Sequence, residues 1–285
     1  MVGDGCTATA DAIAREGRAS IALTFQADAG VVSASVNGVT PTDLGGGGPI
    51  HSGLATEASL VSRVNAEGVF QRADIPLNVG PGVVRFARDP VRRLDSAAAS
   101  ISISPDGVVS LTHAKFVAGG TVVEATGTLK PPTAGDEAWP FVLRAPDAVL
   151  DAEDVEGPPV IADLFAEGRV DPRDGIIHFE RASADLPFGR ADAVMTFIVS
   201  EDGRRLAGAA HISSAPINEL MKAWPIAFVY QPRKAIRDTV MGGVLVSADL
   251  DFALTPRMHD GDPSTNLLID GGLTVDATVR NAVLS

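Results

Sequence analysis

The sequence is poor in the residue types from which most catalytic and metal centres are built. A single cysteine, Cys6, is present among the 285 residues, so the chain cannot form an internal disulfide. No Gly-x-Ser-x-Gly segment marks a nucleophilic serine. The histidines lie far apart, without the i, i+4 spacing of a zinc-binding helix: His51, His113, His178, His211 and His259. The sequence therefore predicts a protein that is not an enzyme, with no catalytic residue, no metal and no cofactor.

Long apolar runs and an excess of positive charge are missing as well. No run of about 18 or more apolar residues occurs, so we expect no transmembrane segment in this chain. Residues Met1–Gly5 have neither the charged nor the apolar part of a signal peptide. The net charge of −13 and the isoelectric point of about 4.7 argue against a nucleic-acid partner, because the phosphate backbone binds basic surfaces.

Aromatic residues are scarce, at 5% of the chain, so the 45% that is hydrophobic consists mostly of small aliphatic side chains. Along many short segments these side chains alternate with Ser, Thr, Asp and Arg. Such alternation places one set of side chains on each face of a β-strand. The sequence predicts a mostly β fold with a few short helices, in which an extended, curled antiparallel sheet forms a β-groove.

Glycine and proline divide this pattern into segments. Pro105-Asp106-Gly107 predicts a hairpin turn between two strands. Short helices are expected at Thr9–Glu16, Asp89–Leu94 and Pro158–Glu167. Junctions of a helix with a following glycine recur at similar intervals, which predicts one elongated domain over residues 1–285 with repeated strand-rich units at 17–95, 95–168, 168–242 and 242–285.

The last expected strand, Leu273–Leu284, reaches the end of the sequence. We therefore expect the chain to be a fragment, and its partners to include the rest of a longer parent chain at both ends.

The segment Ser214–Leu254 is the most organised part of the chain. Its first helix has one apolar face with members at i, i+3, i+4 and i+7: Ile217, Leu220, Met221 and Trp224. Pro225 ends this helix, Pro232 lies at the start of a second one, and Gly242-Gly243 is expected to end that helix as a left-handed C-cap. An alternating strand follows.

Charged residues in and around this segment have an ordinary interpretation. Arg233, Lys234 and Arg237 are expected to form a solvated helix face rather than a headgroup site. The acidic turns Asp151–Asp154 and Asp260–Asp262 lack the spaced ligands of a calcium loop, so they are expected to be solvated. Histidines that fall within expected strands are expected at half-exposed positions.

The order of residues in this segment resembles a protein family. The runs Leu220–Pro225 and Pro232–Arg237, followed by Gly242-Gly243-Val244 and an alternating strand, are similar to the AsmA-like and TamB-like envelope proteins. The most similar branch is the YhdP-like one, which carries a leucine, Trp-Pro, Pro/Ala-Arg, Gly-Gly segment before a strand. The residues that carry the structural motif are Trp224, Pro225, Pro232, Gly242 and Gly243.

The resemblance implies a location and a role. It implies a curled β-sheet with an apolar groove in the periplasm, within an envelope protein whose inner-membrane anchor is not in this chain. It also implies a non-enzymatic role in outer-membrane biogenesis, in which the groove carries phospholipid or another acyl-chain lipid between the inner and outer membranes. The residues implied to line the groove are Leu23, Phe25, Val244, Val246, Ala248, Leu250, Phe252, Leu254, Val275 and Val279.

Two other interpretations remain open from the sequence. The chain could be a structural or interaction module of an envelope protein, a β-sandwich or solenoid whose apolar strand faces pack a closed core. A hydrolase on a β scaffold would need two carboxylates or a Ser–His pair in one pocket, and the sequence offers no such cluster.

Overall fold

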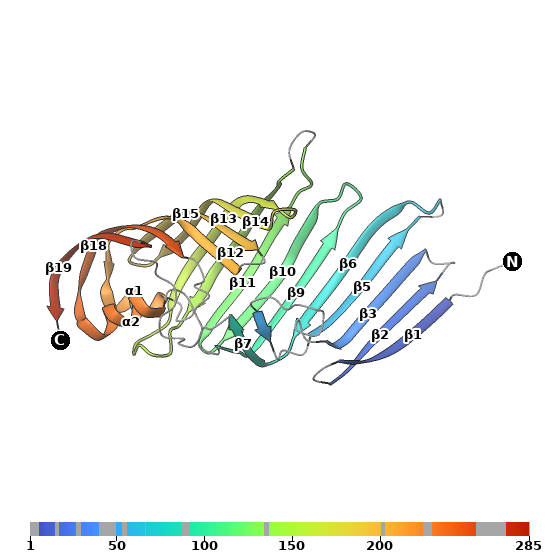
Figure 1. The fold of residues 1–285 in the computed structure, drawn as a ribbon, viewed down its shortest axis with the longest axis horizontal. Coiled ribbons are helices and arrows are strands. Elements are labelled where there is room, and N and C mark those ends of the chain that lie inside the picture. Colours follow the sequence, from blue (N-terminus) through green and yellow to red (C-terminus); the bar gives the residue numbers. More distant parts are fainter. Residues whose placement is uncertain are drawn as a thin grey trace. The chain divides into compact units, whose positions relative to one another are not determined.

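Long antiparallel strands dominate the computed structural model of the protein (Figure 1). The structure describes residues 6–14, 17–26, 30–39, 50–52, 56–65, 67–86, 92–133, 137–200, 203–224, 230–254 and 272–284. Strands make up 72% and helices 7% of the structure, which confirms the predicted mostly β fold with an extended antiparallel sheet and a few short helices. The chain divides into unit 1, residues 1–118 and 125–131, and unit 2, residues 119–124 and 132–285.

In unit 1, neighbouring strands pair antiparallel in the order β1-β2-β3-β5-β6-β9-β10. A second, three-stranded sheet has the order β4-β7-β8. The strands are β1 (Cys6–Ala14), β2 (Gly17–Gln26), β3 (Val31–Val39), β4 (Ile50–Ser52), β5 (Thr56–Val64), β6 (Phe70–Val79), β7 (Gly82–Phe86), β8 (Arg92–Leu94), β9 (Ser96–Ile103) and β10 (Val109–Ala118). β11 (Thr121–Leu129) contributes residues to both units.

The hairpin between β9 and β10 shows how local sequence sets a turn. Gly107 has φ +80°, a conformation that glycine adopts without strain, and its N–H donates to the carbonyl of Ser104 at 2.9 Å. The Ser104 hydroxyl also contacts the Asp106 carboxylate. The turn predicted at Pro105-Asp106-Gly107 is therefore confirmed.

In unit 2, the sheet has the order β12-β13-β14-β15-β16-β18, and β17 and β19 both pair with β18. Two helices, α1 and α2, connect β17 to β18. The elements are β12 (Trp139–Leu150), β13 (Val160–Asp171), β14 (Ile176–Leu186), β15 (Gly189–Ser200), β16 (Gly203–Ile212), β17 (Ala215–Pro216), α1 (Ile217–Ala223), α2 (Tyr230–Thr239), β18 (Val240–Leu254) and β19 (Leu273–Leu284).

A β-bulge in β12 accommodates Pro146, one of the two prolines of this strand. Ala145 and Ala148 pair with Leu164 and Ala162 of β13, so one extra residue lies between them on β12. Within the bulge, Asp147 has φ +53° and its N–H donates to the Asp163 carboxylate at 3.0 Å. Proline lacks an N–H donor, and a bulge is one of the few sheet positions that tolerates it.

Three helices expected from the sequence are wrong or fall partly outside the described residues. Thr9–Ala14 belongs to β1, and Pro158–Glu167 runs into β13. Of the segment 89–94, only 92–94 is described, as β8. In β13 the apolar residues lie on both faces of a central strand, which imitates helical spacing, and pairing with strands on either side decides the outcome. Gly168, an expected repeat junction, lies inside β13.

The two helices expected near Trp224 are confirmed, but the role of the following glycines is not. α2 ends at Thr239, and Gly242 and Gly243 lie inside β18 rather than at a helix C-cap. Gly243 has φ +127°, and the pairing of β18 with β19 is irregular on both sides of Gly242. The glycine pair therefore lies in a bulged part of β18.

Candidate functional site

One face of the unit 2 sheet, which we call the inner face, is apolar on every strand from β12 to β19. The register aligns its side chains across the strands, as for Phe179 of β14 and Met195 of β15. The inner face comprises Trp139, Phe141, Leu143, Ala145, Ala148, Leu150, Val160, Ala162, Leu164, Ala166, Gly168, Val170, Ile177, Phe179, Ala182, Ala184, Leu186, Ala191, Ala193, Met195, Phe197, Leu206, Gly208, Ala210, Ile212, Leu245, Ala248, Leu250, Phe252, Leu273, Val275, Ala277 and Val279.

The opposite, outer face carries the charged side chains of the same strands. They include Arg144, Asp163, Glu167, Arg169, His178, Arg181, Asp185, Arg190, Asp192, Arg205, His211, Asp249, Asp251, Asp276 and Arg280. This segregation means that water solvates one face, while the other is stabilised only by covering its apolar surface.

Helices α1 and α2 cover one part of the inner face (Figure 1). Ala223 of α1 lies in a buried cluster with Val160 of β13, whereas Met221 of α1 lies in a second buried cluster with Leu245 of β18. Three strands, β14, β15 and β16, separate β13 from β18 in the sheet. Because the short α1 reaches both strands, the sheet of unit 2 curls around it.

The C-terminal end of α1 is held by a side chain from α2. Arg233 donates from Nη2 to the carbonyl of Met221 at 3.0 Å and from Nε to the carbonyl of Trp224 at 3.1 Å. Carbonyls in the last turn of a helix have no partner within the helix, and a helix of two turns is unstable alone. Arg233 therefore stabilises α1 where it packs on the sheet.

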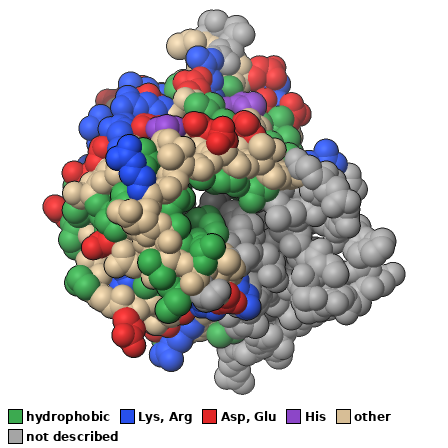
Figure 2. Space-filling model, turned by 90° about the vertical axis from the view of Figure 1, so that its left-hand side faces the viewer, with side chains coloured by type: hydrophobic (Ala, Val, Ile, Leu, Met, Phe, Trp, Pro, Cys, Tyr) green, Lys and Arg blue, Asp and Glu red, His purple; other side chains and the backbone are tan. Residues whose placement is uncertain are grey.

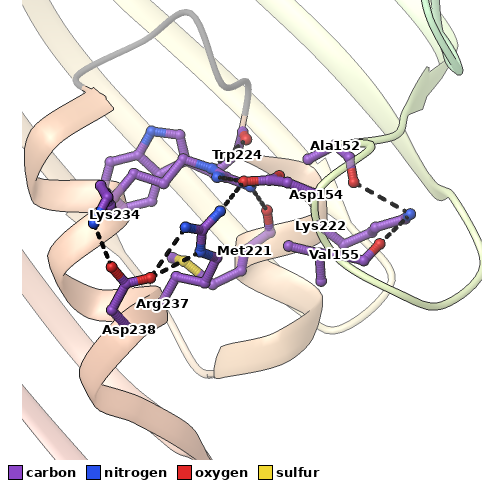
Figure 3. Close-up of polar contacts among 10 residues, drawn as sticks. Ala152, Asp154, Val155, Met221, Lys222, Trp224, Lys234, Arg237 and Asp238 are labelled. Atoms are coloured by element: carbon purple, nitrogen blue, oxygen red, sulfur yellow. Dashed lines mark hydrogen bonds and ion pairs between the residues drawn. The ribbon is translucent and has the colours of Figure 1, made fainter.

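Arg233 is fully buried, and its charge is balanced by Asp154, a residue of the loop between β12 and β13 that Figure 3 labels. The pair is bidentate, with Nη1 to Oδ2 at 2.5 Å and Nη2 to Oδ1 at 2.7 Å. Arg237 adds a contact to Asp154 Oδ2 at 2.6 Å. These hydrogen bonds, mainly those from Arg233, hold the pKa of Asp154 below its ordinary value of 3.8.

A second buried cation ties the same loop to α1. Lys222 donates from Nζ to the carbonyls of Val155 at 2.6 Å and Ala152 at 3.3 Å, and its Nζ lies 2.5 Å from Asp151 Oδ1. In return, the Ala152 N–H donates to the Lys222 carbonyl at 3.0 Å. We call the loop 151–155 together with Lys222, Arg233 and Arg237 the clamp.

The clamp overturns two expectations for charged residues. Arg233, Lys234 and Arg237 do not form a solvated face, because Arg233 is buried, although Lys234 is exposed and pairs with Asp238. The acidic turn 151–154 is not simply solvated, since Asp151 and Asp154 pair with buried cations. The turn Asp260–Asp262 lies outside the described residues.

Away from the helices, the inner face is partly exposed to solvent. Leu143 is 37% exposed, and Val275 and Val279 on β19 are 52% and 40% exposed. Phe141 packs edge-on against Phe179 at a centroid distance of 5.5 Å. Half-buried members outside both buried clusters include Trp139, Val170, Ile177, Met195, Phe197, Leu206 and Phe252. Figure 2, which views the side where β19 lies, shows a hollow with hydrophobic side chains on its walls.

Unit 1 has an apolar sheet face of its own. Among the side chains described in unit 1, only Ala73 and Leu94 are buried hydrophobics, and Phe116 is 44% exposed. The described members of this face are Val32, Ala34, Ala58, Leu60, Ala73, Ile75, Leu77, Val79, Ala97, Ala99, Ile101, Ile103, Val109, Leu111, Ala114 and Phe116.

The structure divides the residues expected to line a groove. Ala248, Leu250, Phe252, Val275 and Val279 are brought together on the inner face. Of these, Ala248 is buried, and Leu250 packs against the buried cluster that Met221 of α1 forms with Leu245 of β18. Part of the expected lining is therefore core beneath the helices.

The expectation for the first residues of β18 needs a correction. Leu245 pairs with Val279 and Ser247 with Thr278, so Val246 is the extra residue of a bulge. The bulge reverses the alternation, which places Leu245 on the inner face and Val244, 38% exposed, on the outer face. A sequence pattern does not show where one residue is inserted into a strand.

Other expected residues are only partly described. Leu23 and Phe25 lie in β2 at register positions opposite Ala34 and Val32, and Leu254 lies in β18, but their side chains are outside the described part. Pro225 is not described, and Pro232 is described only as backbone of α2. Trp224 is half-buried in the cluster of α1, and its N–H donates to the Leu220 carbonyl at 2.9 Å.

The described residues include histidines and other side chains that can bind a metal ion. His113, His178 and His211 lie exposed on strands, and His211 Nδ1 contacts Asp249 Oδ1 at 2.8 Å. No group of three or more His, Cys, Asp or Glu side chains is placed for a metal ion in the described ranges. Within the same ranges, each helix is too short or too polar to cross a membrane.

Comparison with protein-family models, curated proteins and solved structures gave no match to this chain.

Sequence reasoning missed the central part of the inner face and the clamp. Leu143, Phe179 and Met195 could have been predicted from the sequence. They lie in strands where apolar and polar residues alternate as they do in β18. The pairing of Asp154 with Arg233 joins residues 79 positions apart and leaves no local signal.

Proposed function

We propose that the chain binds acyl-chain lipid on the inner face and serves, without catalysis, as a lipid-carrying segment. The observation that carries this proposal is the exposure of apolar side chains on the inner face beyond the helices, as at Leu143, Val275 and Val279. Soluble proteins rarely leave a contiguous apolar surface in water unless it binds something.

The composition of the inner face suits an acyl chain. Each methylene that leaves water contributes about 0.8 kcal/mol, so binding strength grows with the length of chain covered. The inner face carries no charged side chain at the described register positions, so no point on it would hold a headgroup. Because the rows of aliphatic side chains are chemically similar along the face, an acyl chain would move along it rather than bind tightly at one point.

The setting of this activity is the second part of the proposal. The order of residues from Leu220 to Val244 resembles AsmA-like envelope proteins, which supports a periplasmic segment that carries phospholipid between the inner and outer membranes. In this setting the membrane anchor would belong to the rest of a parent chain. The apolar face of unit 1 is a further candidate stretch for the same lipid.

A pair of variants tests lipid binding without disturbing the core. Leu143→Asp puts a charge on the exposed part of the inner face, and Ile161→Asp puts the same charge on the outer face, where Ile161 is 44% exposed. We expect lipid to be extracted from the purified wild-type chain and identified by mass spectrometry. We also expect Leu143→Asp to lose most of it and Ile161→Asp to keep it.

The competing proposal is a structural module whose apolar faces are only core. It is favoured by the part of the inner face that α1 and α2 already fill. Absence of lipid from the wild-type chain, or equal lipid in both variants, would reject lipid carriage and leave the structural module.

A further inference from the structure

The strand β19 is an exposed sheet edge. Within the described part of the chain it pairs with β18 alone, and every residue from Thr274 to Leu284 is exposed. Val283 and Leu284 are 55% and 65% exposed. Free edges in soluble proteins are commonly protected by lysine, proline or short length, because unpaired N–H and C=O groups can pair with another strand. β19 has 12 residues and contains neither lysine nor proline.

The charges on β19 predict which kind of strand would pair with its free edge. Asp276 and Arg280 are the only charged residues of β19, and both lie on the outer face, four positions apart. Asp276 is directly opposite Asp249 of β18. Like charges opposite each other in a sheet are destabilising, so a cation on the free side of Asp276 would be favourable.

We propose that β19 pairs antiparallel with β19 of a second copy of this chain, around a two-fold axis at Thr278. In this register Asp276 of each copy lies opposite Arg280 of the other, so two ion pairs form. The axis is perpendicular to the sheet, so outer faces stay on the same side in both copies. This inference does not depend on lipid binding.

The register follows from the sequence of β19. Centring the pairing on Asp276 or on Arg280 would place like charges together, and centring it on Ala277 would form no ion pair. Centring it on Thr278 places Ala277 opposite Val279 on the inner face and Thr278 opposite itself. The row across the strands then reads His211, Asp249, Asp276 and the Arg280 of the second copy.

Charge exchange tests the ion pairs. We expect the wild-type chain to be a dimer by sedimentation equilibrium. Arg280→Asp should weaken association by roughly tenfold or more, because two attractive pairs become repulsive. The double variant Asp276→Arg with Arg280→Asp should restore the dimer. Arg205→Asp, an exposed change on the internal strand β16, is the control and should leave association unchanged. A monomeric wild-type chain, or a double variant as weak as Arg280→Asp, would overturn the proposal.

Cysteine cross-linking tests the register independently, in a Cys6→Ser background. Thr278→Cys places the two sulfur-bearing residues directly opposite, where Cβ atoms lie about 4.5–5.5 Å apart, so mild oxidation should give a covalent dimer. Thr274→Cys is the matched control, because its counterpart would lie eight positions away along the strand, about 26 Å. Equal cross-linking of both variants, or of neither, would reject this register.

Discussion

The two units have the same kind of sheet but differ in how the apolar face is covered. In unit 2, two buried clusters join the strands to α1, and the clamp holds α1 in place. In unit 1, the described residues of the apolar face are mostly half-buried, and only Ala73 among them is buried. Alternation alone therefore gives a sheet with one apolar face, and the packing of α1 on that face in unit 2 converts part of the face into a core.

This difference predicts that stability is unevenly distributed. Both tryptophans, Trp139 and Trp224, belong to unit 2, so tryptophan fluorescence reports unfolding of unit 2 alone, while far-UV circular dichroism reports both units. The two signals together separate effects on the two units.

The largest effect is expected from Arg233→Ala. The change removes the bidentate pair with Asp154 and both carbonyl contacts of α1, and loss of one partner from a buried ion pair costs about 3–5 kcal/mol. Urea denaturation followed by tryptophan fluorescence measures this cost. Arg169→Ala, which removes an exposed pair with Glu180, should cost less than about 1 kcal/mol. Equal costs for the two variants would mean that the clamp does not hold unit 2.

The second largest effect is expected from truncating a buried apolar residue. The loss in free energy of unfolding should be larger in unit 2 than in unit 1. Met221→Ala removes a side chain that is 3% exposed from the cluster of α1, which should cost about 2–4 kcal/mol in unit 2. Ile101→Ala truncates a half-buried member of the unit 1 face and should cost about 1 kcal/mol. A larger cost for Ile101→Ala, measured by circular dichroism, would show that the unit 1 face is a covered core.

A smaller effect should be confined to unit 1. Gly30 has φ +59°, and an added Cβ would lie 2.3 Å from the carbonyl oxygen of Val64, so Gly30→Ala should destabilise unit 1 by about 1–3 kcal/mol. Gly68 has φ +78° but open space around it, so Gly68→Ala should cost about 1 kcal/mol. The fluorescence transition should stay unchanged in both variants. A shift of that transition would show that the units unfold together.

The smallest effect is a pH dependence of unit 2. The pKa of Asp154 is lower in the folded chain than its ordinary value of 3.8, so its ionised form adds stability above about pH 4. This contribution is lost as the pH falls through the lowered pKa. The difference in free energy of unfolding between wild type and Asp154→Asn should therefore shrink on acidification. A difference that is constant from neutral pH to pH 2 would contradict this role of Asp154.

Sequence patterns predicted the strands better than their faces. The hairpin at Gly107 and the two helices around Trp224 follow from local turn chemistry and helical spacing, and the structure confirms them. The helix expected at Pro158–Glu167 is a strand, because its apolar residues serve both faces and its neighbours supply the hydrogen bonds. The bulge at Val246 changed which residues of β18 face inward.

The sequence by itself determined that this chain would form amphipathic strands, because alternation with a period of two is a local property of the backbone. Only the tertiary structure decided where the apolar face becomes a core and where it stays exposed. That outcome depends on contacts between residues far apart, such as Asp154 with Arg233 and Val160 with Ala223. Their strength comes from burial, and burial exists only once the sheet has curled around α1.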